Sequence, residues 1–233
     1  MSQTTSAYAD TRNMYAVHIL FRREFGLLPD LVQSVAHGDE KRAKVIADHI
    51  NLMTHTLNHH HLAEDEVLWP LLLARAPKEV DPVVHLAEGH HQRIDTLLHR
   101  TQAPLAAWSS GAGSGARDAL ALALRELDVV LFEHMGLEEQ LVLPVVEQHI
   151  FPAEWEAMEL RSVAGIAPQN MPLVFGMAMY ESGSEIVPEP LRADIVPVAP
   201  GAYADYAERV HGTRTPPRAA DVVFGAPSVG AKA

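Results

Sequence analysis

Cysteine is absent from the 233 residues of this chain. Disulfides, thiolate zinc sites and iron–sulfur clusters are therefore excluded, because each of them needs cysteine sulfur. The sequence also has no apolar run of about 18 residues, the length of a membrane-spanning helix. Its N-terminal segment has no basic stretch followed by an apolar one, so we read no secretory signal. We expect a cytoplasmic protein that does not span a membrane.

Basic residues are scarce as well. Lys and Arg number 18 against 30 Asp and Glu, which gives a formal net charge of −12. A sequence-independent nucleic-acid binder needs a basic surface, so we expect neither nucleic acid nor a membrane as partner. The negative charge suits a protein that attracts cations. With 48% hydrophobic residues the chain can bury a real core, in one or at most two domains.

Histidine, in contrast, is plentiful, with 14 in the chain. Two stretches that contain it share one signature, which is His-x3-Glu-x5-Pro at His60, Glu64 and Pro70 and again at His134, Glu138 and Pro144. A His and a Glu four residues apart lie on one face of a helix. Two such helices facing each other would bring two imidazoles and two carboxylates to one point in a bundle core. That set of ligands suits a pair of metal ions.

The hydrophobic pattern predicts an all-α fold. Apolar residues recur at helical spacing over residues 11–36, 40–76, 82–101 and 117–148, and no segment before residue 160 alternates like a strand. Pro70 should kink the second helix or end its regular part. Residues 102–116 contain Pro104 and SSGAGSGA, and we expect them to form a flexible linker. We predict an antiparallel up-down four-helix bundle.

Beyond residue 150 the pattern of long amphipathic segments ends. We expect residues 1–150 to form the bundle and residues 151–213 to form a C-terminal extension that packs on it. Short helices are predicted there near 154–163, 171–180 and 202–213. The extension either covers apolar bundle surface or, as the less favoured alternative, closes a substrate pocket. Residues 214–233 are expected to be a disordered tail.

The repeated acids occupy positions where a continuous apolar face would otherwise run. Glu64 shares a stripe with Leu57 and Val67, and Glu138 shares one with Leu131 and Leu141. An ionised Glu on such a face is very costly unless it is paired or bound to a metal. Two copies at identical spacing favour the metal.

The first and third helices would complete the site. His18 lies on the stripe of Phe21 and Phe25, although a lone inward His is more often a core residue than a ligand. We favour His91 over its neighbour His90, because adjacent histidines cannot both point to one site. The roles of four further residues stay open between ligand and outer position: His61, Asp65, His90 and Glu139. Of these, Asp65 and Glu139 could orient an imidazole, and Glu139 could replace Glu138.

The order His18, His60-x3-Glu64, His91 and His134-x3-Glu138 resembles the hemerythrin-like (HHE cation-binding) family. Trp69-Pro70 and the run ending at Pro144 are similar to bacterial members, and the tail resembles extensions of actinobacterial relatives. The resemblance implies a non-haem di-iron centre holding two iron ions (Fe2+ or Fe3+) with an oxo or hydroxo bridge. It implies that the two Glu bridge the irons and that the four His are terminal ligands. Iron is preferred over manganese and zinc.

The chain departs from the oxygen-carrying hemerythrins in two places. The third helix lacks their His-x3-His pair, because Ala87 precedes His91 by four residues, and the fourth helix has His-x3-Glu rather than His-x4-Asp. We therefore expect one iron with fewer nitrogen ligands, completed by water, hydroxide or Asp65, in a site open to small oxidants.

Three functions follow from this reading. The leading one is binding or reduction of O2, peroxide or NO, with a small oxidant or diatomic gas as partner. The alternatives are a di-iron oxidase or catalase-like enzyme acting on peroxide or an organic substrate, and an iron or oxygen sensor. The sequence leaves the physiological ligand and the oligomeric state open.

Overall fold

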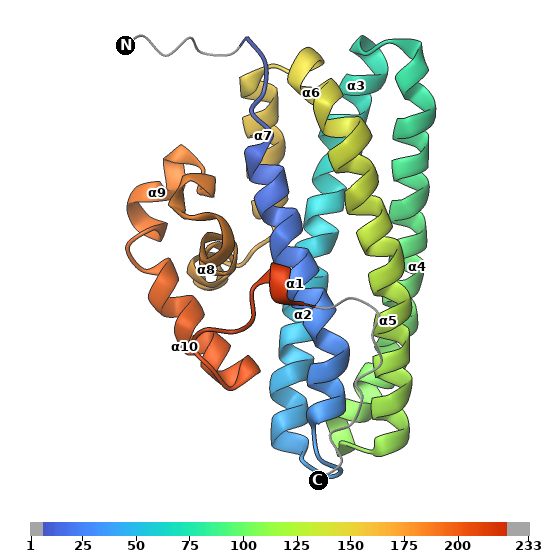
Figure 1. The fold of residues 1–233 in the computed structure, drawn as a ribbon, viewed down its shortest axis with the longest axis vertical. Helices are drawn as coiled ribbons and strands as arrows, with labels where there is room; N and C mark the ends of the chain where they lie inside the picture. Colours follow the sequence, from blue (N-terminus) through green and yellow to red (C-terminus); the bar gives the residue numbers. More distant parts are fainter. Residues whose placement is uncertain (1–6, 223–233) are drawn as a thin grey trace.

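The computed structural model describes residues 7–222, and these contain helices and no strand. Four long helices form a bundle: α1 (Arg12–Ser34), α2 (Glu40–Ala63), α4 (Asp81–Gly111) and α5 (Ser114–Leu137). Figure 1 shows them standing side by side, with α1 and α4 running from the top of the view to the bottom and α2 and α5 returning. The all-α bundle expected from the sequence is confirmed. None of the helices in this part of the chain is long and apolar enough to cross a membrane.

The turn between α1 and α2 contains Gly38 and Asp39. Gly38 has φ +79, a left-handed conformation that glycine adopts without steric cost. The Asp39 side chain then accepts a hydrogen bond from the backbone N–H of Arg42 at 3.0 Å and so caps the first turn of α2. The turn returns the chain so that α2 packs beside α1.

Both repeated motifs end their helix in the same way, with one turn of π-helix. The first π turn is η1 (Glu64–Leu68) and leads into α3 (Trp69–Arg75), and the second is η3 (Glu138–Val142) and leads into α6 (Leu143–His149). The Trp69 N–H bonds the carbonyl of Glu64, and the Leu143 N–H bonds the carbonyl of Glu138. The wider turn lets the chain pass the proline that follows, which has no N–H to donate. Each π turn starts at the repeated Glu.

The prediction of a flexible linker over residues 102–116 is wrong. Helix α4 continues through Pro104 to Gly111, and only Ala112 and Gly113 separate it from α5. Leu105 and Trp108 lie on this added part of α4 and are buried in the core. Their burial offsets the hydrogen bond that Pro104 removes, and the glycine-rich stretch SSGAGSGA becomes the end of one helix and the start of the next.

The bundle has two apolar core clusters with a polar belt between them. One cluster contains Phe21, Leu57, Ile94 and Leu131, and the other contains Met14, Ala63, Ala87 and Val142. On each of the four long helices, a candidate ligand lies in sequence between members of the two clusters. The belt therefore crosses the bundle at one level.

The C-terminal segment packs on the α1 and α2 side of the bundle, away from α4 and α5 (Figure 1). It comprises α7 (Pro152–Val163), α8 (Met171–Ser182), α9 (Glu189–Ile195) and α10 (Ala199–His211), with short 3-10 turns at Pro168–Asn170 and Ser184–Ile186. A further such turn, η2 (Lys78–Val80), precedes α4. Arg42 of α2 donates hydrogen bonds to the carbonyls of Arg209 and Val210, the last turn of α10. These bonds satisfy carbonyls that a helix end leaves free and hold α10 against the bundle.

Part of the expected disordered tail is ordered. Residues 214–222 follow α10 and include a 3-10 turn at Ala219–Asp221. Arg218 Nη1 donates to the carbonyl of Tyr180 at 2.7 Å, and the Ala219 N–H donates to Glu181 Oε1 at 3.1 Å. These bonds fix the segment in place. Residues 223–233 of the predicted tail lie outside the described residues.

Candidate metal centre

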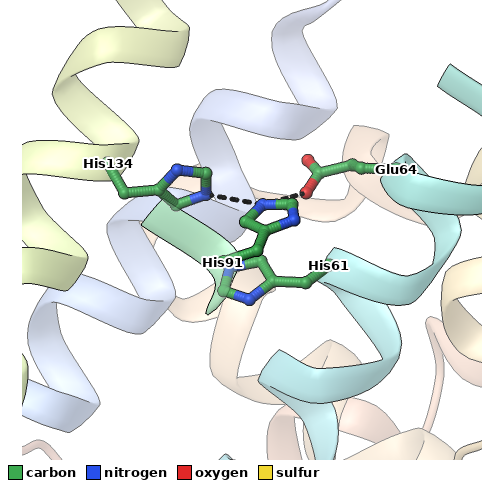
Figure 2. A group of neighbouring side chains, drawn as sticks. All are labelled: His61, Glu64, His91 and His134. Carbon is green, nitrogen blue, oxygen red and sulfur yellow. Dashed lines mark hydrogen bonds and ion pairs between the residues drawn. The ribbon is translucent and has the colours of Figure 1, made fainter. Parts of the chain in front are cut away.

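The polar belt consists of two adjoining groups of buried imidazoles and carboxylates. His61, Glu64, His91 and His134 form the first group, and His18, His60 and Glu138 form the second. Within each group the ligand atoms lie within 4.8 Å of one another. Figure 2 shows the first group, with the His91 ring between the carboxylate of Glu64 and the ring of His134. Five nitrogen donors from the four long helices and two carboxylates from the two π turns thus come together.

The Glu64 carboxylate lies between the two groups. Its Oε1 is 3.4 Å from His60 Nε2, which belongs to the second group. Its Oε2 is 3.4 Å from His91 Nε2, which belongs to the first. The two oxygens of one carboxylate therefore face nitrogens of different groups.

Glu138 has a corresponding position on the opposite motif. Its Oε2 is 3.3 Å from His18 Nε2 and 3.4 Å from His134 Nε2. Both repeated acids therefore stand between the same two sets of imidazoles. Each acid therefore offers a carboxylate to imidazoles of both groups.

The polar atoms of the belt have the spacing of metal ligands rather than that of hydrogen-bonded partners. Nε2 of His18, His60 and His61 and all four oxygens of Glu64 and Glu138 are buried and find no hydrogen-bond partner in the described part of the chain. Two donors that are each about 2.1 Å from one ion stand about 3.0 to 3.4 Å apart in tetrahedral or octahedral geometry. The 3.3 and 3.4 Å separations in the belt match such ligand edges. Unpaired buried groups of this kind are costly unless a cation joins them.

Two further acids orient imidazoles from outside the belt. His91 Nδ1 donates to Asp65 Oδ1 at 2.7 Å, and the same oxygen accepts from Trp69 Nε1 at 2.9 Å. His18 Nδ1 donates to Glu139 Oε1 at 3.0 Å, and Arg22 Nη1 donates to that oxygen at 2.6 Å. A proton held on Nδ1 leaves Nε2 free to face inward, which is the arrangement that metal-binding histidines use.

Burial and charge set the protonation of the belt. Burial lowers the pKa of His60 to about 3 and that of His134 to about 4, so both rings are neutral as metal ligands must be. Burial alone would also lower the pKa of His18 and His91, but their hydrogen bonds to acids raise these values to about 9 and about 10. Burial and the charge of Glu138 raise the pKa of Glu64, whereas the histidines around Glu138 pull its pKa down against burial. The acids therefore stabilise positive charge at His18 and His91, whereas His60 and His134 stay neutral.

The structure places the alternatives left open by the sequence. His91 belongs to the belt, whereas His90 is half-buried and lies outside both groups. Glu138 faces the imidazoles, whereas Glu139 and Asp65 hold the outer nitrogens of His18 and His91. The structure thus distinguishes the two members of each adjacent pair by their position.

His61, which the sequence leaves open between ligand and outer position, lies inside the belt. Its ring stacks on His91, with centroids 4.1 Å apart and planes at 16°. Successive helical residues point about 100° apart, so His60 and His61 face different groups rather than one shared point. With His61 the two groups hold three and two nitrogens, although the third long helix contributes only one. The signal in the sequence was the run of three histidines ending three residues before Glu64.

Cavities reach the belt from two sides. A groove of about 610 Å³ lies over His61 and His91. Most of the side chains that line it are polar and come from α2, η1 and α4, namely Asn58, Asp65, Glu88, Gln92 and Asp95. On the other side, two cavities of about 60 Å³ each end at His60. Their walls are mostly apolar and include Val17 of α1 and Phe175 and Ile186 of the C-terminal segment. Pockets for larger ligands are several hundred Å³, so these two cavities admit only very small molecules.

We expect His61→Ala to retain fewer metal ions per chain than wild type, because it removes one of the three nitrogens from the first group. His59→Ala is the matched control, since His59 is an adjacent histidine outside both groups. Metal analysis of the purified variants measures the effect. Equal metal content in the two variants would contradict the placement of His61 as a ligand.

Comparison with known proteins agrees with this geometry. The family model for the hemerythrin HHE cation binding domain matches residues 9–153. That range contains both groups of the belt, both π turns and the first residues of α7. Searches of curated proteins and of solved structures each found no match. Because the family model covers more than half of the chain, and because the buried His and Glu groups have the character of a cation site, the chain belongs to the hemerythrin HHE cation-binding domain family.

Proposed function

We propose that this chain is a non-haem di-iron protein that binds or reduces O2, peroxide or NO at the belt. The observation that carries the proposal is the position of Glu64 and Glu138, each within 3.4 Å of imidazole nitrogens from both groups. Carboxylates between two sets of imidazoles suit two adjacent ions rather than one. His18, His60, His61, His91 and His134 would hold the ions, with the two acids shared.

The donor set favours iron. Imidazole and carboxylate without thiolate suit iron or manganese, while structural zinc sites are usually rich in cysteine. Iron, when bound, would supply the capacity to bind small oxidants and to exchange electrons with them. The chain supplies fixed ligand geometry, with Asp65 and Glu139 keeping a proton on Nδ1 of His91 and His18.

The size of the cavities at His60 supports a small ligand. At about 60 Å³ each and with mostly apolar walls, they suit a weakly polar diatomic molecule and exclude a bulky organic substrate. Phe175 and Ile186, which line them, come from the C-terminal segment. That segment therefore narrows the approach to the belt instead of opening a large pocket there.

A peroxide-decomposing enzyme is the second candidate. The groove over His61 and His91 is polar and open, with Asp65 and Glu88 in its wall. Such a surface favours exchange of hydrogen peroxide and water with the belt, and carboxylates there can accept or release protons. This observation does not favour a larger organic substrate.

The test is metal analysis and absorption spectroscopy on the full chain purified from iron-replete cells. We expect two iron ions per chain and an absorption band that changes when O2, peroxide or NO is added. Steady turnover of added peroxide would select the enzyme, and a stable spectral change without turnover would select the binding protein. Protein that contains no iron under these conditions would refute the proposal.

A further inference from the structure

A third buried group of metal-binding side chains lies outside the belt. Glu24 of α1, His49 of α2 and His211 at the end of α10 bring one carboxylate oxygen and two imidazole nitrogens within 4.8 Å of one another. Glu24 and His49 are fully buried, and the His211 side chain is 4% exposed. The group therefore joins the bundle to the last helix of the C-terminal segment.

The three donor atoms converge without bonding to one another. Glu24 Oε2 is 3.2 Å from His49 Nε2 and 3.2 Å from His211 Nε2. All three atoms are buried, and none has a hydrogen bond to any residue in the range 7–222. The two rings stand 5.7 Å apart at 80°. Contacts of this length between unbonded donors match the ligand edges of a single ion, at about 3.0 to 3.4 Å.

The other oxygen of Glu24 is fully engaged, which turns Oε2 toward the histidines. Oε1 accepts from Arg23 Nε at 3.0 Å, from Arg23 Nη2 at 2.6 Å and from the Tyr203 hydroxyl at 3.1 Å. Arg23 Nη1 also bonds Glu181 Oε1 at 2.7 Å. Glu181 is also paired with Arg218, at 3.8 Å, so the two guanidiniums balance the two carboxylates. What stays unsatisfied is Glu24 Oε2, a buried carboxylate oxygen with no hydrogen bond among the described residues, and such an atom is costly to bury without a partner.

Tyr206 provides an outer partner of the kind that metal-binding histidines have. Its hydroxyl is 3.2 Å from His49 Nδ1. When Nδ1 carries the proton and donates it to this oxygen, the lone pair of Nε2 points toward Glu24 Oε2 and His211. This is the same division between an outer hydrogen bond and an inner donor atom that the belt shows at His91 and Asp65.

The third group is separate from the belt. Glu24 follows His18 by six residues and His49 precedes His60 by eleven, which correspond to roughly 9 and 17 Å along their helices. His211 lies beyond residues 9–153, the range that the family model covers. No residue of the third group belongs to either group of the belt.

We propose that Glu24, His49 and His211 bind one divalent first-row transition ion, with zinc as the preferred ion, and that this ion fastens α10 to α1 and α2. Two imidazoles and one carboxylate form a borderline donor set that suits zinc, with water completing a tetrahedron. Zinc also exceeds ferrous iron in affinity for a given set of such ligands. The ion would give Glu24 Oε2 and the two Nε2 atoms the partner that they lack and would join three elements that are distant in sequence.

Zinc binding to the full chain tests the proposal. Protein stripped with a chelator is reloaded with zinc, and the ions retained per chain and their dissociation constants are measured. We expect His211→Gln to retain one zinc fewer than wild type. The matched control is His37→Gln, an exposed histidine in the turn before α2, which should retain the wild-type number. The difference of one ion is expected whatever the belt holds, so failure of the di-iron proposal would leave this result intact.

A second variant distinguishes a metal site from a network of hydrogen bonds. Tyr206→Phe keeps all three ligands and removes only the partner of His49 Nδ1, so zinc at this site should bind about 10 to 100-fold more weakly. Zinc should also slow proteolysis of α10 in wild type and not in His211→Gln. Equal zinc retention in wild type and His211→Gln, or unchanged zinc affinity in Tyr206→Phe, would overturn the proposal.

Discussion

Glu138→Ala should lose metal from both groups of the belt and unfold more readily than wild type. Its Oε2 lies within 3.4 Å of both His18 and His134, so one substitution removes a donor from each group. His18 and His134 are buried and would lose the carboxylate that lies between them. Removing one partner of a buried charged pair typically costs about 3 to 5 kcal/mol. Metal content per chain and denaturant unfolding at pH 7 measure the two effects.

Glu139→Ala is the matched control for this substitution. Glu139 is the next residue in the chain and its carboxylate is half-buried. It bonds His18 Nδ1 and Arg22 from outside the belt. We expect the Glu139 variant to keep bound metal with about 10 to 100-fold lower affinity, because it only loosens the orientation of His18. If the two variants lost metal equally, the assignment of Glu138 to the inside of the belt and Glu139 to the outside would be wrong.

Gly176→Ala should separate α8 from α10 and destabilise the C-terminal segment. A Cβ at residue 176 would lie 2.3 Å from the carbonyl oxygen of Ala199 and 2.8 Å from Cβ of Tyr203. The nearest atom belongs to a helix backbone, so a side chain cannot simply rotate away. Overpacking of this kind costs about 1 to 3 kcal/mol. Because Tyr203 also bonds Glu24, its displacement should reach the third group of ligands.

Gly201→Ala provides the comparison, since Gly201 lies in the first turns of α10 and has no atom within 4 Å of the position its Cβ would take. Alanine there should stabilise the protein by up to about 1 kcal/mol through its higher helix propensity. Thermal unfolding of the two variants should therefore shift in opposite directions. A neutral or stabilising Gly176→Ala would show that α8 and α10 are not packed as closely as described.

Much of the bundle and the belt followed from periodicity and spacing. The stripe through His18 and Phe21 and the His-x3-Glu repeats are local features, because helical geometry fixes which side chains share a face within a few residues. For the same reason the repeated acids could be expected to lie inside the bundle. The buried positions of Glu64 and Glu138 agree with that expectation.

The errors arose where tertiary packing overrode local composition. A proline with a glycine-rich stretch usually ends a helix. Here α4 continues past Pro104, because the burial of Leu105 and Trp108 stabilises the helix. The sequence left His61 open between ligand and outer position, because one apolar stripe describes one site, whereas two adjacent groups of ligands can use both of two neighbouring residues. Local pattern also gave no indication of the third group, since Glu24, His49 and His211 come from three elements whose packing the sequence does not display.

The two sides of the belt differ in their relation to water. His61 and His91 border a polar groove, while His60 borders small cavities with mostly apolar walls. A hydrated ion or a proton can travel along the first side at little desolvation cost, whereas a molecule entering on the second must leave its hydration shell behind. We therefore expect any uncharged small molecule that enters the protein to reach the belt at His60, and protons to exchange with water near His91.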